Sequence, residues 1–273
     1  DGYTYCFEPG GSCKKNKALK RSIEDWKPDI ILVFGWNFPG HLSLMRHFKG
    51  KIPVWFRGDS TLLDEKPGLR KLIRRLALSW VYSYVDRAWY VGSQNQAYYL
   101  KHGLKASQLF FMPHAIDNER FRDDPEKQYA QKAQQWRLDL GIQSGDFVIV
   151  FAGKLEPVKD PTLLLDAVMD LNKNYFVTNP IKLLFIGSGV LEDELRTKVK
   201  SDSNVFFLGF QNQTMMPIAY RLGNIVCLPS KSETWGLSVN EAMASARPAL
   251  VSGQVGCALD LVVEGRTGFI FQN

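Results

Sequence analysis

The chain has 273 residues, 45% of them hydrophobic and 23% charged, with a formal net charge of +6. This composition is typical of a folded globular protein, and the longest apolar runs, such as residues 30–34 and 147–151, fall far short of the roughly 20 residues that a membrane-spanning helix needs. The charge is uneven, because residues 1–145 hold 23 Lys and Arg against 15 Asp and Glu, whereas residues 146–273 hold 11 against 13. A basic half suggests an anionic partner such as a membrane surface, a phosphorylated acceptor or nucleic acid.

The cysteines and the start of the chain indicate a compartment. Cys6, Cys13, Cys227 and Cys257 show no C-x-x-C spacing, so we expect reduced thiols in a cytoplasmic protein. A Cys6–Cys13 pair, as a disulfide or as metal ligands, is the alternative. The chain has no initiator Met and no secretory leader, and its first residue has the appearance of an internal cut.

The first half alternates strands with helices after a loop at residues 1–16. Its strands are continuous apolar runs, as in a parallel sheet that is covered on both faces. Strands are predicted at residues 29–35, 52–56, 87–92 and 109–112. Helices are predicted at residues 17–26, 41–48 and 68–84, and from Ser93 or Gln94 to His102.

The helix at residues 68–84 is the most amphipathic of the chain. Arg70, Lys71, Arg74 and Arg75 lie in its first half, and apolar residues dominate the second. Such a helix can lie on an anionic bilayer, which would make the protein a peripheral one at the inner membrane face. The alternative, purely structural interpretation is a core helix with a solvated basic face.

A polar helix at residues 123–139, followed by Ser144-Gly145-Asp146, marks the predicted domain boundary. The predicted domains are residues 1–145 and 146–273. In the second, strands are predicted at residues 147–152, 181–186, 205–208, 225–228 and 249–251, and helices at 161–172, 191–200, 214–222 and 238–245. Strict alternation of strands and helices predicts an α/β fold, with a parallel sheet in each of two lobes.

The stretch from Pro229 to Ala244 is the most informative part of the sequence. It runs from a strand through a polar loop with Glu233 into a helix that starts near Ser238 and carries Glu241. Such a junction points free backbone N–H groups and a positive helix end at an anion, and carboxylates accept hydrogen bonds from sugar hydroxyls. A nucleotide sugar is therefore the expected ligand.

Two further strand ends carry glycine loops. Gly153 and Lys154 follow one strand, with Lys159 shortly after, and two ammonium groups can neutralise a diphosphate. Gly187 follows the next strand, and glycine lets a ligand approach the backbone closely. For each loop alone, an ordinary strand-to-helix turn is the favoured interpretation.

Taken together, these segments resemble the nucleotide-binding half of the retaining glycosyltransferases of family 4. The resemblance lies in the order and spacing of Gly153-Lys154-Leu155 with Lys159, Phe185 to Gly189, Leu208-Gly209-Phe210, Pro229 to Ala244, Val255-Gly256 and Gly265 to Phe269. The first half matches more loosely, through residues 52–54, 91–93 and 113–117. The resemblance implies the GT-B fold of two Rossmann-like domains facing across a cleft, an acceptor-side N-terminal domain and a nucleotide-sugar-binding C-terminal domain.

The resemblance also implies roles for the residues of the central stretch. Glu241 would accept hydrogen bonds from the ribose, and Glu233 would contact the donor sugar. Gly236, Leu237 and Ser238 would offer backbone N–H groups to the diphosphate. The donor would be a UDP- or GDP-sugar, and the acceptor a glycan or lipid-linked glycan.

The lysines complete the implied chemistry. Lys159 would bind the diphosphate, and Lys154 stands where the family usually has arginine, so the charge is kept without the planar fork. Transfer would retain configuration through same-face attack, with the leaving phosphate taking the acceptor's proton and cations stabilising its charge. No metal or other cofactor is then required.

Two further departures from the family are visible. The loop Arg57-Gly58-Asp59 replaces a histidine that many relatives have, and Asp59 or Arg57 is expected to face the donor sugar. Relatives also continue beyond both ends of this chain, which implies truncation and an incomplete N-terminal domain. A polysaccharide-synthesis enzyme is the leading function.

Functions of other classes remain open. A non-catalytic nucleotide-sugar-binding or scaffold protein would fit an incomplete acceptor half, and a membrane-surface adaptor would use the basic helix. No nucleic-acid partner is expected, because the basic residues match no nucleic-acid-reading motif.

Overall fold

The computed structural model describes residues 17–65, 68–174, 179–200 and 202–272. The chain divides into two compact units, residues 1–113 and residues 114–273, each described here by itself. The predicted N-terminal loop, with Cys6 and Cys13, lies outside the described residues. The other two cysteines, Cys227 and Cys257, are free and buried, as expected of reduced thiols, and burial raises the pKa of each thiol to about 12.

The first unit holds a four-stranded parallel sheet in the order β1-β2-β3-β4. Its strands are β1 (Ile31–Phe34), β2 (Val54–Arg57), β3 (Arg87–Tyr90) and β4 (Leu109–Phe111). Its helices are α1 (Lys17–Trp26), α2 (Pro39–Phe48), α3 (Leu69–Tyr82), α4 (Ser93–Lys101) and the short η1 (Ala106–Gln108). All four predicted strands and all four predicted helices are confirmed.

Each strand of this sheet lies beside the preceding strand in the chain, always on the same side of it. Right-handed crossovers then place α2, α3 and α4 on one face of the sheet. That face carries the core, in which Val54 and Phe56 are buried against the helices. Side chains between them point to the opposite face, where the rings of Trp55 and Trp89 meet at 5.4 Å. None of the crossover helices in the described residues covers that second face.

The second unit has a six-stranded parallel sheet in the order β10-β9-β8-β5-β6-β7. Its strands are β5 (Val148–Ala152), β6 (Lys182–Ile186), β7 (Val205–Phe207), β8 (Ile225–Leu228), β9 (Ala249–Ser252) and β10 (Gly268–Phe271). The five predicted strands are confirmed, and β10 was not predicted. The strand order reverses between β5 and β8: β6 and β7 follow on one side of β5, and β9 and β10 follow on the far side of β8.

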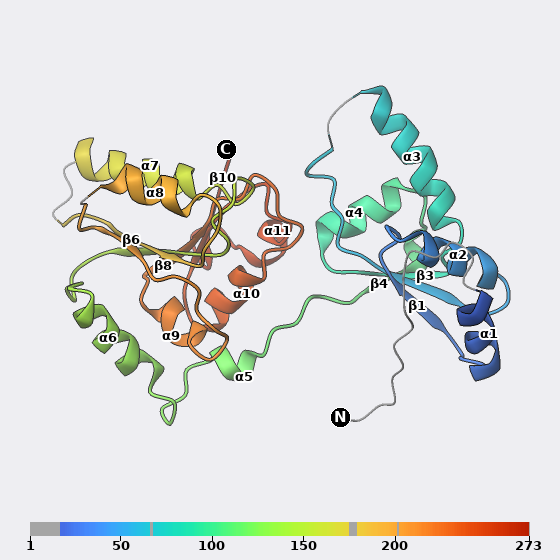
Figure 1. Ribbon diagram of the computed structural model, residues 1–273, viewed down its shortest axis with the longest axis horizontal. Coiled ribbons are helices and arrows are strands. Elements are labelled where there is room, and N and C mark those ends of the chain that lie inside the picture. Colours follow the sequence, from blue (N-terminus) through green and yellow to red (C-terminus); the bar gives the residue numbers. More distant parts are fainter. Residues whose placement is uncertain (1–16, 66–67, 175–178, 201, 273) are drawn as a thin grey trace. The chain divides into compact units, whose positions relative to one another are not determined.

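This reversal puts helices on both faces of the second sheet. Figure 1 shows α7 and α8 along one side of the sheet, and α6 and α9 on the other. The helices of this unit are α5 (Asn118–Phe121), α6 (Tyr129–Asp139), α7 (Pro161–Asn174), α8 (Glu192–Val199), α9 (Met216–Arg221), α10 (Leu237–Ala244) and α11 (Ala258–Leu261). Two cores lie above and below the sheet.

The boundary between the units lies earlier in the chain than the predicted boundary after Gly145. Helices α5 and α6 pack with the second unit, because Phe121 and Ala133 are buried in its core. Arg221 on α9 fixes this segment by donating hydrogen bonds to the carbonyl of Phe121 at 2.8 Å and to Asp123 at 2.6 Å. The polar composition of residues 123–139 concealed a narrow apolar stripe.

Candidate functional site

A cavity of about 480 Å³ opens at the carboxyl ends of β5, β6 and β7, next to the point where the strand order reverses. Open α/β sheets bind their ligands at such a point. The cavity is lined by Ala152, Gly153, Lys154, Glu156, Ile186, Gly187, Ser188, Gly189, Phe210, Gln211, Gln213, Met216, Tyr220, Ser238 and Glu241. Five predicted site residues are therefore brought together here: Gly153, Lys154, Gly187, Ser238 and Glu241.

Close backbone contact between two strand ends shapes the floor of this cavity. Gly187 has φ of +128°, and a Cβ at this position would stand 2.1 Å from the carbonyl oxygen of Gly153. The N–H of Gly153 donates to the carbonyl of Ile186 at 2.9 Å. Gly187 is thus required by the packing of the loops, independently of any ligand, whereas a Cβ at Gly153 would meet only the ring of Phe151, at 3.7 Å.

Lys154 supplies the positive charge at the rim. Its side chain is 76% exposed, and its ammonium lies 3.8 Å from Glu156. An exposed pair at this distance contributes little, so the charge of Lys154 is available to an anion in the cavity.

Helix α10 closes another side of the cavity. It begins at Leu237, one residue earlier than predicted, after Gly236 with φ of +101°. Residues of a first helical turn have backbone N–H groups without partners inside the helix, which favours an anion there. Ser238 lines the cavity, whereas Gly236 and Leu237 contribute to the helix start without lining it.

Glu241 lies one turn further along α10, with its carboxylate at the cavity wall. The hydroxyl of Tyr220 donates a hydrogen bond to Glu241 Oε2 at 2.7 Å. Burial, and then the adjacent Glu241 carboxylate, raise the pKa of Tyr220 well above its ordinary value. The phenol therefore stays protonated and acts as a donor. The sequence pattern predicted Tyr220 only as part of a helix.

Lys159 and Glu233 form a separate group beside the cavity. The two side chains form an ion pair, and neither lines the cavity. Lys231 lies next to them, where its ammonium is 2.9 Å from Asp160 and its N–H donates to the carbonyl of Val158 at 2.9 Å. The loop after β5 is thereby fastened to the loop that carries Glu233.

Asp59 belongs to the first unit, in the loop that follows β2. The loop is held by α4, because Tyr99 donates to the carbonyl of Gly58 at 3.0 Å and Asn95 donates to that of Ser60 at 2.8 Å. A role of Asp59 or Arg57 toward a donor sugar stays a prediction.

Several lining residues were not predicted, among them Phe210, Gln211, Gln213 and Met216. Phe210 is 78% exposed, which is unusual for a phenylalanine. An aromatic residue directly after a strand-end glycine is the signal that could have identified it.

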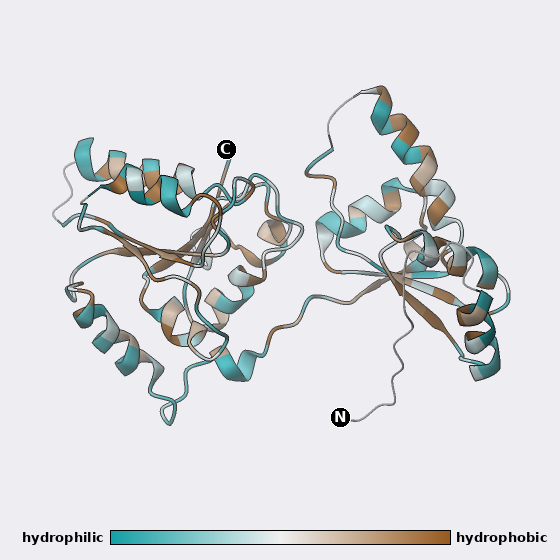
Figure 2. Cartoon of the chain, viewed as in Figure 1, coloured by the Kyte–Doolittle hydropathy of each residue, from teal (hydrophilic) through white to brown (hydrophobic). Residues whose placement is uncertain are grey.

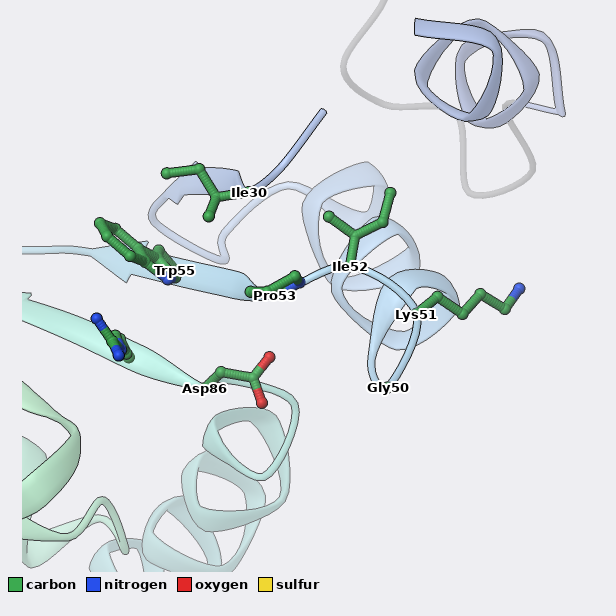
Figure 3. A pocket seen from close by; sticks show the side chains of 8 residues that line it. Ile30, Gly50, Lys51, Ile52, Pro53, Trp55 and Asp86 are labelled. Carbon is green, nitrogen blue, oxygen red and sulfur yellow. The ribbon is translucent and has the colours of Figure 1, made fainter. Parts of the chain in front are cut away.

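A second cavity of about 590 Å³ lies in the first unit, at the amino ends of β2 and β3. Figure 3 shows Ile30, Trp55 and Asp86 around it, with Lys51 pointing away. The carboxylate of Asp86 is already engaged by Lys49 at 2.5 Å and by the N–H of Val54 at 2.9 Å. This cavity is at the edge of the sheet opposite to the strand-end loops and contains no predicted site residue.

Within the described ranges, no group of three or more His, Cys, Asp or Glu side chains is arranged to hold a metal ion. None of the helices in the described part of the chain combines the length and hydrophobicity that crossing a bilayer requires.

Comparisons with known proteins agree with this arrangement. In sequence, the chain is 30% identical to the D-inositol 3-phosphate glycosyltransferase of Gordonia bronchialis over an alignment of 143 residues, which covers 49% of this chain and 31% of that protein. A Campylobacter jejuni N-acetylgalactosaminyltransferase that acts on an undecaprenol-linked glycan is 24% identical over 94% of this chain and 64% of its own length. The chain spans about a third of the curated relatives from Gordonia and Nocardia, 31% and 37%.

Among solved structures, Anabaena HepE in complex with UDP matches with a TM-score of 0.73 at 19% identity, over 93% of this chain and 67% of that one. The sucrose-phosphate synthase of Thermosynechococcus elongatus matches with a TM-score of 0.70 at 18% identity, over 94% and 63%. These likenesses confirm the predicted GT-B fold class of two Rossmann-like parallel-sheet units.

The family model described as glycosyl transferases group 1 matches residues 132–273, just over half of the chain. The match contains the whole cavity and both predicted glutamates. The chain therefore belongs to the glycosyl transferases group 1 family.

Proposed function

We propose that this chain acts as a family 4 glycosyltransferase that moves a hexose from a UDP- or GDP-sugar to a glycan or lipid-linked glycan, with retention of configuration, and that its second unit binds the donor. One observation carries the proposal: the cavity at the strand reversal brings Lys154 and the start of α10 to the same space as Glu241. Its volume of about 480 Å³ lies within the usual range of ligand pockets. The relatives named above transfer sugars, and HepE binds UDP.

Different residues would contact different parts of the donor. The diphosphate would lie between Lys154 and the first turn of α10, where both a cation and backbone N–H groups are present. Glu241 would accept hydrogen bonds from the ribose. Lys159 and Glu233, just outside the cavity, would contact the diphosphate and the donor sugar, and Asp59 or Arg57 would face the donor sugar as the resemblance predicts.

Catalysis would depend on the leaving group. Negative charge builds on the departing diphosphate, and Lys154, Lys159 and the start of α10 would stabilise it. The acceptor hydroxyl would attack from the same face, form the new glycosidic bond as the old one breaks, and pass its proton to a phosphate oxygen. This mechanism needs no metal. The enzyme would work in the cytoplasm.

The proposal is tested with Glu241→Ala. We expect UDP or GDP to bind at least about tenfold more weakly, because two hydrogen bonds to a charged acceptor are lost, and donor hydrolysis or transfer to fall with it. Calorimetry measures nucleotide binding, and product detection measures donor hydrolysis or transfer. Glu194→Ala, on the exposed face of α8, is the control.

Unchanged binding and turnover in Glu241→Ala would contradict the proposal. Nucleotide binding by the wild-type chain without any turnover would instead support the alternative, a non-catalytic nucleotide-sugar-binding protein.

A contact with the inner membrane face is a second proposal, and it is favoured by helix α3. Its last turns are core, with Leu78 and Val81 buried, but earlier apolar side chains face solvent, and Ile73 and Leu76 are 61% and 65% exposed. Basic residues adjoin this stripe, and Figure 2 shows hydrophobic and hydrophilic bands alternating along α3. An apolar stripe with adjoining cations fits an anionic bilayer.

We therefore expect the chain to bind vesicles of phosphatidylcholine with phosphatidylglycerol, and to lose this binding at high salt or in the double variant Ile73→Glu, Leu76→Glu. Co-sedimentation measures binding. Leu100→Glu on α4 is the matched control, because Leu100 is also exposed. Absence of vesicle binding at low salt would contradict this second proposal.

A further inference from the structure

Tyr220 is the one tyrosine among the residues that line the cavity, and it is almost completely buried, at 1% exposure. Its only polar side-chain atom donates a hydrogen bond to Glu241 Oε2. A carboxylate offers about four acceptor positions, so this bond occupies one and leaves the others for a ligand. The inference below rests on the proposed function, in which Glu241 receives the ribose.

The tyrosine is itself held in place by its neighbour in the chain. Arg221 is buried, and it donates to the carbonyl of Pro217 one turn earlier at 2.8 Å and to the carbonyl of Phe121 at 2.8 Å. The ring of Phe121 also contacts the Tyr220 ring, with centroids 6.1 Å apart. Helix α9 is therefore fixed to α5, and the Tyr220 hydroxyl has a defined position.

Glu241 by contrast is only half-buried where it lines the cavity, and its side chain has three torsions. Without a fixed partner, its carboxylate would sample several rotamers, and ordering it would lower the affinity for a ligand. The hydrogen bond from α9 removes this freedom before a ligand arrives.

We propose that Tyr220 is a positioning residue for nucleoside recognition: its hydroxyl holds the Glu241 carboxylate in the orientation that accepts the 2′ and 3′ hydroxyls of a ribose. The site then selects ribonucleoside diphosphates over deoxy analogues through the pair rather than through Glu241 alone. Tyr220 does not touch the reacting atoms.

The test uses the full chain, with UDP, GDP and their 2′,3′-dideoxy counterparts as probes, and Tyr220→Phe as the variant. We expect Tyr220→Phe to bind UDP or GDP about tenfold more weakly and the dideoxy probes within about twofold of wild type. A merely structural role would weaken all probes alike. Tyr129→Phe, in the same core but away from the cavity, is the control.

A second arm combines the variants. In the Glu241→Ala background, Tyr220→Phe should change nucleotide affinity by less than about twofold, because the group that it positions is gone. Urea unfolding of each variant checks that the fold is intact.

The outcomes separate the two proposals. Equal weakening of ribose and dideoxy probes, or the same loss with and without Glu241, would overturn the role of Tyr220 while leaving the proposed function standing. A wild-type chain that binds none of the probes would overturn both.

Discussion

At Gly187 the backbone of one strand-end loop touches the backbone of another. A Cβ there would meet the Gly153 carbonyl at 2.1 Å, and φ of +128° is a conformation that residues with a Cβ rarely adopt. The obstruction is main chain on both sides, so no side chain can rotate away. The cavity floor therefore depends on the absence of a single methyl group.

We predict that Gly187→Ala lowers the free energy of unfolding of the second unit by at least about 2 kcal/mol. Gly141→Ala is a matched control, because Gly141 also has positive φ, +74°, but has open space around it. The control should lose only about 1 kcal/mol, the cost of a left-handed backbone. Urea unfolding followed by circular dichroism measures both, and equal losses would show that the contact with Gly153 costs nothing.

Residue types were easier to predict than residue pairings. The sequence indicated two glutamates and two lysines near one strand edge, because parallel strands bring their carboxyl ends together. It did not indicate that Lys159 pairs with Glu233, or that Glu241 pairs with Tyr220. The first pairing joins two loops and the second joins α9 to α10, so both depend on side-chain directions in separate segments, which the spacing along one segment does not determine.

At the scale of elements, buried strands were the most predictable feature. In a chain of alternating turns and helices, a short continuous apolar run such as β5, all of whose residues are buried, is typical of a buried strand. Strand β10 was not predicted, because it begins at a glycine.

Helix α6 shows the opposite case. Most of its residues are exposed, and five of its eleven residues are Gln, Lys or Arg. A few apolar positions, with Ala133 buried among them, suffice to fasten it to α9. Predicting a linker from polarity alone therefore placed the domain boundary too late.

The boundary leads to a prediction on fragments. Residues 114–273 should unfold cooperatively, whereas residues 146–273 should be less stable by about 5 kcal/mol or more. The shorter fragment loses Phe121 from the core and leaves the buried Arg221 without Asp123. Urea unfolding of the two fragments gives the comparison, and equal midpoints would place α5 and α6 outside the folding unit.

At the scale of the whole molecule, the two sheets differ in how they are wound. The second sheet grows in both directions from β5 and β8, so its own helices cover both of its faces. The first grows in one direction, and its described crossover helices cover one face. Both follow from the same right-handed crossover, applied to different strand orders.

The single-direction winding of the first sheet bears on how the chain folds. The face with Trp55 and Trp89 also carries Phe34 and Phe110, which are 61% and 41% exposed. Apolar area that stays in water adds nothing to the free energy of folding. We expect the second unit to fold autonomously. We expect the first unit to unfold with full cooperativity only when some other surface buries its aromatic face.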